Sequence, residues 1–198
     1  MTADDETAEP TELAYPDPPL SDGVVALRPW TDADLDFIVA ACQDAEIARF
    51  SPVIPVPYTE ADALQWLETM DAVRLADGGF DLAVTRAADG APLGAIGIGQ
   101  LDRMLASATI GYWLAREARG RGHMSRAVRL LARWAFEELG LARIALTTDP
   151  ENVVSQRVAE RCGFTREGRL RSHMLIRHTG QRRDSLVYGL LPGELTSD

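Results

Sequence analysis

Apolar and polar positions recur along this chain with two periods, which predict where helices and strands lie. Helical spacing, with apolar residues three or four positions apart, runs through four segments that begin near Thr31, Thr59, Ser125 and Asn152. Short runs of apolar and β-branched residues lie between these segments and predict strands. The predicted strands are Val24–Leu27, Phe80–Arg86, Leu93–Leu101, Ala108–Leu114, Arg143–Thr147, Phe164–Ile176 and Asp184–Leu191.

Residues that cap or interrupt helices mark the ends of these elements. Thr59, with Asp62 three positions later, resembles a capping box and predicts the start of the second helix. Gly140 and Gly163 follow the third and fourth helices, where glycine commonly ends a helix. Residues 50–58 contain three prolines and are predicted to form an irregular loop. The order of strand, two helices, three strands, helix, strand, helix and two strands predicts one mixed α/β domain of the α+β type.

The first twenty residues differ in composition from the rest. Residues 1–20 hold six acids, four prolines and no base, which predicts a disordered acidic N-terminal arm. We expect neither a signal peptide nor a membrane span, because no basic start or long apolar segment is present. We therefore expect a folded domain over 21–192, a tail over 193–198 and a cytoplasmic protein. Cys42 and Cys162 lie far apart without metal-ligand spacing, so no metal site is predicted.

Charge is distributed unevenly, and all twenty basic residues are arginines. Residues 1–102 contain four arginines and twenty acids, whereas residues 103–183 contain sixteen arginines and seven acids. This polarity suits a polyanionic ligand on the basic side and a cationic partner on the acidic side. A solvated surface with uneven charge is the alternative. Nucleic acid is not expected as a partner, because aromatic residues do not alternate with the arginines and the acidic half would repel it.

The run Arg-Gly-Arg-Gly-His-Met at 119–124 lies between a predicted strand and the third predicted helix. Glycine lets the backbone approach a ligand closely and adopts positive φ without steric cost. The helix that follows presents unpaired N–H groups and the positive end of its dipole, both of which favour an anion. The run therefore suits a pyrophosphate. Taken alone, it also fits a glycine turn with solvated arginines.

Together with this run, three further segments resemble the GNAT superfamily of acyl-CoA-dependent N-acetyltransferases, and most closely its ribosomal-protein alanine N-acetyltransferase branch. The four segments follow family order and spacing across residues 22–192, and they are Val25–Pro29, Ile110–Met124, Asn152–Phe164 and Asp184–Leu190. The resemblance implies a mixed, mostly antiparallel central sheet flanked by helices. It also implies that this sheet is splayed in the middle, where acetyl-CoA enters between strands 108–114 and 143–147.

The resemblance also assigns residues to the coenzyme. Backbone N–H groups of the loop bind the pyrophosphate, and the Leu114 backbone pairs with the pantetheine arm. Asn152 binds the same arm, with a plain helix cap as its other role. Met124 stands where the family has glycine or alanine, and its larger side chain narrows the groove unless it folds away. The cofactor-binding set is Leu114, Arg119, Gly120, Arg121, Gly122, His123, Met124, Ser125 and Asn152.

Ser155 stands where this branch places a hydroxyl near the coenzyme sulfur, which makes it the candidate catalytic residue that protonates the leaving thiolate. An exposed serine in the first helical turn is the alternative. Many relatives use a tyrosine for this step, but that position is Ala159 here. Relatives often place a glutamate at the position of Thr109, so the general base stays open, with Asp149 or Glu151 acting through water as candidates. A site without an obvious base suits an α-amine, which reaches its neutral form more easily than a lysine amine.

The sequence therefore predicts an enzyme that transfers an acetyl group from its cosubstrate acetyl-CoA to a primary amine by direct attack on the thioester. The acceptor is a protein N-terminal α-amine or a small cationic amine, and the protein is expected to be a monomer or homodimer. The alternative is a GNAT-fold acyl-CoA-binding regulatory module without efficient transferase activity, which the departures at Met124, Thr109 and Ala159 favour. Cys162 and Tyr188 are expected to pack rather than react. A nucleotide-binding loop is disfavoured, because the Gly-x-x-x-x-Gly-Lys spacing is absent.

Overall fold

The computed structural model describes residues 12–197, in which eight strands form one sheet. The strands lie in the order β1-β2-β3-β4-β5-β6-β8-β7, and each neighbouring pair is antiparallel except β5 with β6. The predicted mixed, mostly antiparallel sheet is confirmed. The strand bounds are β1 Leu20–Ser21, β2 Val25–Arg28, β3 Phe80–Arg86, β4 Pro92–Asp102, β5 Ser107–Leu114, β6 Arg143–Thr148, β7 Thr165–Ile176 and β8 Gln181–Leu190.

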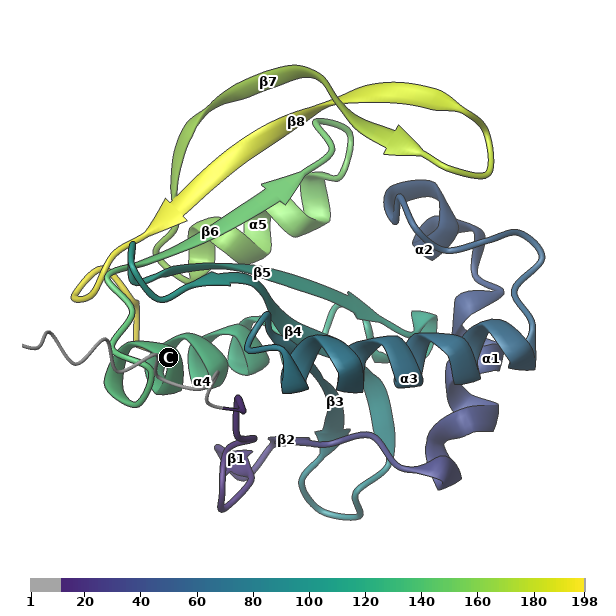
Figure 1. Ribbon diagram of the computed structural model, residues 1–198, viewed down its shortest axis with the longest axis horizontal. Helices are drawn as coiled ribbons and strands as arrows, with labels where there is room; N and C mark the ends of the chain where they lie inside the picture. The colour runs from purple at the N-terminus through teal and green to yellow at the C-terminus, as the bar shows by residue number, and fades with distance from the viewer. Residues whose placement is uncertain (1–11, 198) are drawn as a thin grey trace, which may run out of the picture.

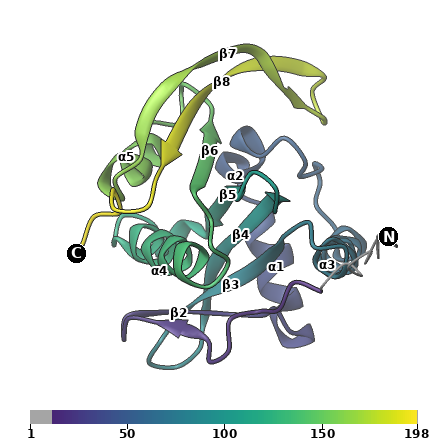
Figure 2. The same ribbon diagram turned by 60° about the vertical axis from the view of Figure 1, so that its left-hand side comes forward.

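Helices cover both faces of the sheet, so a hydrophobic cluster forms on each side (Figure 2). Helices α4 and α5 pack on one face, and α1, α2 and α3 pack on the other. No helix within residues 12–197 is both long and apolar enough to cross a bilayer. The helix bounds are η1 Asp32–Asp34, α1 Leu35–Cys42, α2 Ala45–Phe50, α3 Glu60–Leu75, η2 Arg116–Ala118, α4 His123–Glu137 and α5 Val153–Arg161.

Helix α4 has the buried stripe that its hydrophobic pattern predicts. Ala127, Val128, Leu131 and Ala135 recur every three or four positions, and each is fully buried in the cluster beneath the helix. The burial of this stripe holds α4 against the sheet, and it thereby fixes the position of the loop that enters the helix.

The helices before β3 follow the predicted pattern in part. Thr59 and Asp62 form the expected capping box, in which each side chain accepts a hydrogen bond from the other residue's N–H. Residues 51–58 have no regular structure, as the prolines predict. Helix α2 was not predicted, because its six residues are too few to show a helical period. It is capped by Asp44, whose side chain accepts a hydrogen bond from the N–H of Glu46 (3.0 Å).

The sheet opens between β5 and β6. These two strands pair only where Ser107–Thr109 lies beside Arg143–Ala145. Beyond this point β5 continues beside β4 as far as Leu114, while β6 continues beside β8 as far as Thr148. The strands therefore diverge toward their carboxyl ends, as Figure 1 shows, and the predicted splay is confirmed. We call this opening the β5–β6 split.

The long hairpin of β7 and β8 forms the outer edge of the sheet on the C-terminal side (Figure 1). Its register shifts twice, between Arg166 and Gly168 and between Leu170 and Met174. Such bulges bend a strand and increase its twist. The end of the hairpin reaches the proline-rich loop, where Arg177 donates its N–H to the carbonyl of Pro52 (3.1 Å).

The expected disorder of the N-terminal arm is wrong for residues 12–20. Leu13 is 2% exposed, and the ring of Tyr15 packs against Phe80 with centroids 5.4 Å apart. Arg74 lies over the Tyr15 ring and donates to the carbonyl of Leu13 (3.2 Å). Acids and prolines dominate the composition of the arm, so composition alone does not show that Leu13 and Tyr15 can pack against the core. The remainder of the predicted arm, 1–11, lies outside the described residues.

The tail predicted at 193–198 also packs on the domain as far as it is described. Thr196 donates its N–H to the carbonyl of Cys162 (3.3 Å), and Leu195 packs against the main hydrophobic cluster. The folded unit therefore extends beyond 21–192 at both ends. Asp198 lies outside the described residues.

Replacing Leu13 by alanine should lower the free energy of unfolding by about 2–5 kcal/mol, because it leaves a cavity in the main cluster. Urea denaturation measures this change. The matched control is Leu105→Ala on the β4–β5 turn, where the side chain is 68% exposed and the change should stay within about 0.5 kcal/mol. Equal effects of the two substitutions would contradict the docking of residues 12–20.

Candidate active site

The glycine–arginine loop lies at the open end of the β5–β6 split and leads into α4. Gly120 and Gly122 have φ values of +73° and +79°, in the left-handed region that favours glycine. A Cβ added at either position would meet no atom within 4 Å. The backbone conformation, rather than crowding, therefore requires glycine here, and the space beside the loop is open to a ligand.

The N-terminus of α4 faces this space without a side-chain cap. Gly122 is its N-cap residue, and no acidic residue lies in the first turn. The first N–H groups of the helix therefore have no partner within the helix and favour an anion. Met124 and Ser125 are buried, and Met124 packs in the main cluster. The side chain of Met124 thus folds away from the loop. The ring of His123 lies with its Nδ1 3.2 Å from the Ala118 carbonyl.

The two arginines of the loop have different surroundings. Arg119 donates from Nε to the carbonyl of Leu114 (3.0 Å) and pairs with Asp44 at the cap of α2 (2.7 Å). Arg121 is exposed and has no hydrogen bond or ion pair with any residue in the described part of the chain. Arg119 therefore ties the loop to β5 and α2, while Arg121 remains available to a ligand.

Strand β5 presents unpaired backbone groups to the split. Ala115 donates its N–H to the carbonyl of Leu93 on β4 (2.9 Å). Because backbone groups alternate in direction along a strand, those of Tyr112 and Leu114 point away from β4 and toward the split. The Arg119 contact occupies the Leu114 carbonyl on that side. An extended ligand that enters the split can therefore pair with this edge of β5.

Helix α5 forms the opposite wall of the split and carries Asn152 and Ser155. Asn152 is the N-cap residue, and its Oδ1 accepts a hydrogen bond from the N–H of Ser155 (3.1 Å). The Oγ of Ser155 lies 3.1 Å from the hydroxyl of Tyr112, whose single hydrogen can be donated to this Oγ or to the Ser155 carbonyl (3.3 Å). Ser155 is half-buried, and the Tyr112 contact joins the two walls of the split.

Tyr112 was not assigned a role from the sequence. Its hydroxyl is buried, and this burial raises its pKa well above the ordinary value of 10.0, an effect that the Ser155 hydrogen bond partly offsets. The phenol therefore stays protonated at neutral pH and can donate a proton toward Ser155. Tyr112 lies in the segment Ile110–Met124 that carries the family resemblance, but no spacing rule joins it to a serine 43 residues later.

Thr109 and the two candidate bases, Asp149 and Glu151, all have hydrogen-bond or ion-pair partners in the structure. Thr109, which replaces a glutamate, donates its hydroxyl hydrogen to the carbonyl of Gly99 (3.0 Å). Asp149 accepts from the N–H of Glu151 (2.8 Å) and pairs with Arg183 (3.2 Å). The exposed Glu151 also pairs with Arg49 (2.9 Å).

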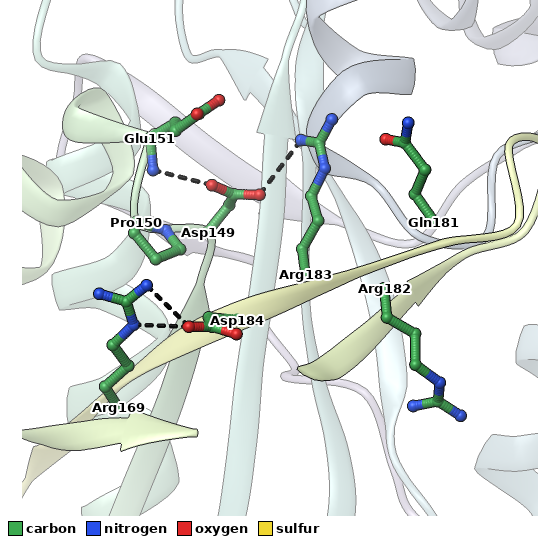
Figure 3. A pocket seen from close by; sticks show the side chains of 8 residues that line it. All are labelled: Asp149, Pro150, Glu151, Arg169, Gln181, Arg182, Arg183 and Asp184. Carbon is green, nitrogen blue, oxygen red and sulfur yellow. Dashed lines mark hydrogen bonds and ion pairs between the residues drawn. The ribbon is translucent and has the colours of Figure 1, made fainter. Parts of the chain in front are cut away.

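Asp149 and Glu151 line a polar cavity of about 450 Å³ between the end of β6 and the β7–β8 hairpin (Figure 3). In Figure 3 the carboxylate of Asp149 points toward Arg183, and that of Asp184 points toward Arg169, with which it pairs (2.7 Å). Opposite charges therefore largely cancel within this cavity. Its lining residues are Asp149, Pro150, Glu151, Arg169, Gln181, Arg182, Arg183 and Asp184.

The remaining candidates occupy structural positions. Cys162 is fully buried and its sulfur donates to the carbonyl of Ser125 (3.4 Å), and Tyr188 is fully buried with its hydroxyl donating to Glu160 (3.3 Å). Both pack, as the sequence predicts. Within residues 12–197, no three His, Cys, Asp or Glu side chains lie together in a way that could hold a metal ion.

Comparison with known proteins identifies the family. Residues 25–165 match the family model described as "Acetyltransferase (GNAT) domain". The chain belongs to the GNAT family. The resemblance drawn from four motifs is therefore confirmed.

Known members of the GNAT family resemble the chain to different extents. It is 40% identical over 106 residues to YdaF of Bacillus subtilis (strain 168), provisionally named a ribosomal N-acetyltransferase. That match covers 54% of this chain and 57% of YdaF, so it spans little more than half of the relative. YoaA of the same organism, named an uncharacterized N-acetyltransferase, is 28% identical over 83% of this chain and 92% of its own length.

Among solved structures, Mycobacterium smegmatis RimJ in complex with CoA-disulfide superposes with a TM-score of 0.80 and 26% identity. The match covers 91% of this chain and 88% of RimJ. This likeness extends over the sheet and the helices on both of its faces.

The different surroundings of the loop arginines predict different effects on stability. Arg119→Gln should lower the free energy of unfolding by about 1–3 kcal/mol, because it removes two contacts and leaves Asp44 without its cation. Arg121→Gln should change it by less than about 0.5 kcal/mol, because Arg121 has no partner to lose. Thermal and urea denaturation of both variants measure the effects. A larger loss in Arg121→Gln would contradict the assignment of Arg119 as the tether.

Proposed function

We propose that this GNAT protein transfers an acetyl group from acetyl-CoA to a primary amine, with a protein N-terminal α-amine as the favoured acceptor. The observation that carries the proposal is the β5–β6 split, which ends at an uncapped helix N-terminus preceded by two left-handed glycines. A long ligand with a polar arm and a pyrophosphate fits this combination. The coenzyme bound to RimJ supports the same assignment.

The loop residues would hold the pyrophosphate. Backbone N–H groups from Arg121 to Ser125 face the anion, and the free side chain of Arg121 adds positive charge. Arg119, Gly120 and His123 shape the loop, because Arg119 is tethered and Gly120 supplies a left-handed turn. Met124 contributes through its backbone, since its side chain is in the core.

Two residues would hold the pantetheine arm on opposite walls. On β5, the N–H of Leu114 points into the split and can pair with an amide of the arm. On α5, the Oδ1 of Asn152 caps the helix, which leaves its side-chain NH2 group to donate to the arm. The helix cap and the coenzyme contact are therefore compatible in one residue.

Bound acetyl-CoA supplies a thioester, whose carbonyl carbon the acceptor amine attacks. Ser155 would donate its hydroxyl proton to the leaving sulfur, and Tyr112 would replace that proton through the hydrogen bond that joins them. Backbone N–H groups on the open edge of β5 would stabilise the negative charge that develops on oxygen. The buried phenol of Tyr112 suits this role because it keeps its proton at neutral pH.

A protein amine is the favoured acceptor for two reasons. YdaF carries the provisional name of a ribosomal N-acetyltransferase. An α-amine, with a pKa of about 7.7–8.0, also reaches its neutral form more easily than a lysine amine. We also infer a cytoplasmic location, which the two free cysteines support. The departure at Met124 no longer favours the alternative of a regulatory acyl-CoA-binding module, because the Met124 side chain packs in the core and does not obstruct the loop.

Calorimetric titration tests the coenzyme assignment. Acetyl-CoA should bind with micromolar affinity, and ATP should not match it. Gly122→Val should weaken acetyl-CoA binding at least about 10-fold, because a β-branched residue is strained at positive φ and its side chain would enter the cradle. Circular dichroism checks that the variant is folded. If folded Gly122→Val bound acetyl-CoA with unchanged affinity, the assignment of the pyrophosphate to this loop would be wrong.

Turnover with amine acceptors, measured by thiol release, separates a transferase from a binding module. Ser155→Ala should lower kcat on the order of 10²-fold while acetyl-CoA binding stays intact, because only the leaving thiolate loses its proton donor. Tyr112→Phe should lower kcat as well, and the double variant should lose little more than Ser155→Ala, because the two groups act in sequence. Additive losses would contradict the relay, and an unchanged rate would remove Ser155 from the mechanism.

A further inference from the structure

The face of the sheet beneath α1 and α3 has a row of three paired positions that is almost free of side chains. Asp81 on β3 pairs with Gly97 on β4, which pairs in turn with Gly111 on β5. Directly paired residues of neighbouring strands point to the same face. Trp113 lies two residues after Gly111 and joins the cluster of α1 to α3, so the row belongs to that face. Two glycines and one carboxylate therefore form a floor at the middle of the sheet.

The carboxylate of Asp81 lies over the first glycine of this floor. A Cβ added at Gly97 would be only 2.3 Å from Asp81 Oδ1 and 2.7 Å from its Cγ. A Cβ added at Gly111 would meet no atom within 4 Å, and Gly111 is exposed although it lies within a central strand. Since neighbouring strands are about 4.8 Å apart, the carboxylate lies about one strand spacing from the open space above Gly111.

Asp81 has no partner of its own in the described part of the chain. No hydrogen bond or ion pair reaches its carboxylate, whereas the buried Asp34 and Asp149 both pair with arginines. Burial alone raises the pKa of Asp81 from 3.8 to about 6. The side chain is still partly accessible to solvent, so a proton can leave it. A carboxylate that is buried without a partner opposes folding, and a ligand cation would relieve this cost.

No charged group near Asp81 in the described part of the chain neutralises its carboxylate. On α3, which packs over β3, Asp71 and Arg74 pair with each other (2.9 Å). Tyr15 interacts electrostatically with Asp81, but burial raises the pKa of Tyr15 above 10.0, so it stays neutral near pH 7. The neighbouring positions on β4 and β5 in this row are glycines.

Aromatic side chains border the open space above Gly111. The rings of Trp30 and Phe37 both stack on Trp113, with centroids 6.3 Å and 6.2 Å away. Trp66 meets Trp30 edge-on (5.7 Å). Trp113 lies two residues from Gly111 on the same face, so the stacked rings give this side of the open space an apolar wall. Such a wall strengthens electrostatic contacts with a cation or amine that enters.

We propose that Asp81 is the residue that accepts the proton of the acceptor amine, which reacts in the open space above Gly111. This inference rests on the proposed function. The amine nitrogen forms a bond with the thioester carbonyl carbon, and the carbon–sulfur bond breaks. The proton released by nitrogen passes to the Asp81 carboxylate and then to solvent, and the sulfur takes its proton from Ser155. Asp81 thereby supplies the base that is absent at Thr109.

Asp81→Asn tests this role, because it keeps the shape of the side chain and removes its charge. At pH 7.5 the variant should bind acetyl-CoA as the wild type does, while kcat/KM for the amine falls at least about 10²-fold. Its melting temperature should rise by at least about 2 °C, because an unpaired buried charge is removed. A residue with a purely structural role would lose stability and activity together. Asp89→Asn, on the exposed β3–β4 turn, is the control that should change neither.

The pH dependence provides an independent measurement. Protonation of the amine lowers kcat/KM below about pH 8 in both proteins. Asp81 accepts a proton only when ionised, so wild-type kcat/KM should fall more steeply below about pH 6, and Asp81→Asn should lose this additional fall. The folded-state pKa lies above 3.8, so ionisation of Asp81 opposes folding. The stability gain of the variant should therefore be absent below about pH 4, grow up to pH 6 and stay constant above it.

Gly111→Val tests the location of the reaction. Valine suits a strand, and its Cβ meets no neighbour, so the fold should persist while KM for the amine rises at least about 10-fold. The inference is overturned if Asp81→Asn retains the wild-type kcat/KM. It is equally overturned if, of the two variants, Asp149→Asn is the one whose kcat/KM falls. It is also overturned if Asp81→Asn loses activity and stability together. A wild-type protein that turns over no amine would instead overturn the proposed function, so the two failures are distinct.

Discussion

Strands β5 and β6 share only three residue pairs, and the rest of the molecule is arranged around the place where they part. A sheet that opens leaves backbone groups without partners on both sides, which is costly unless a ligand or side chain pairs with them. Each strand keeps its other neighbour, β4 for β5 and β8 for β6, so neither is lost from the sheet. The buried stripe of α4 and the contact between Tyr112 and Ser155 hold the two walls at a fixed separation. The opening is therefore part of the native fold.

The two faces of the sheet have separate roles around this opening. One face carries α4 and α5, and with them the helix N-terminus, Asn152 and Ser155. The other face carries α1 to α3, the aromatic rings around Trp113, and the floor that contains Asp81. Under the proposed function, a coenzyme and an amine would approach from opposite faces and meet at the split without competing for the same side chains. Arg119 spans the boundary, because it contacts both β5 and the cap of α2.

Much of this arrangement could be predicted from the sequence, because long elements with a clear period dominate the fold. Strands β2 to β8, helices α1, α3, α4 and α5, and the loop at 119–124 follow from local patterns, whereas the two-residue strand β1 does not. The motifs identified the family, and with it the splay. Interactions that depend on three-dimensional placement could not be predicted. Tyr112 meets Ser155 only because the fold brings α5 beside β5, and Asp81 lies over Gly97 only through the β3–β4 register. The docking of Leu13 was missed because composition averages over a whole segment.

The shape of the outer hairpin also bears on aggregation, because its strand β7 is an edge of the sheet. Strand β7 leaves twelve residues along one edge of the sheet, where free N–H and C=O groups could pair with a strand of another molecule. Its two register shifts interrupt any continuous ladder, and the left-handed Ser172 lies within the second of them. Arg166 and Arg171 place positive charge along the same edge, which opposes pairing with a second copy there. The bends that shape the hairpin thus also protect the sheet from edge-to-edge aggregation.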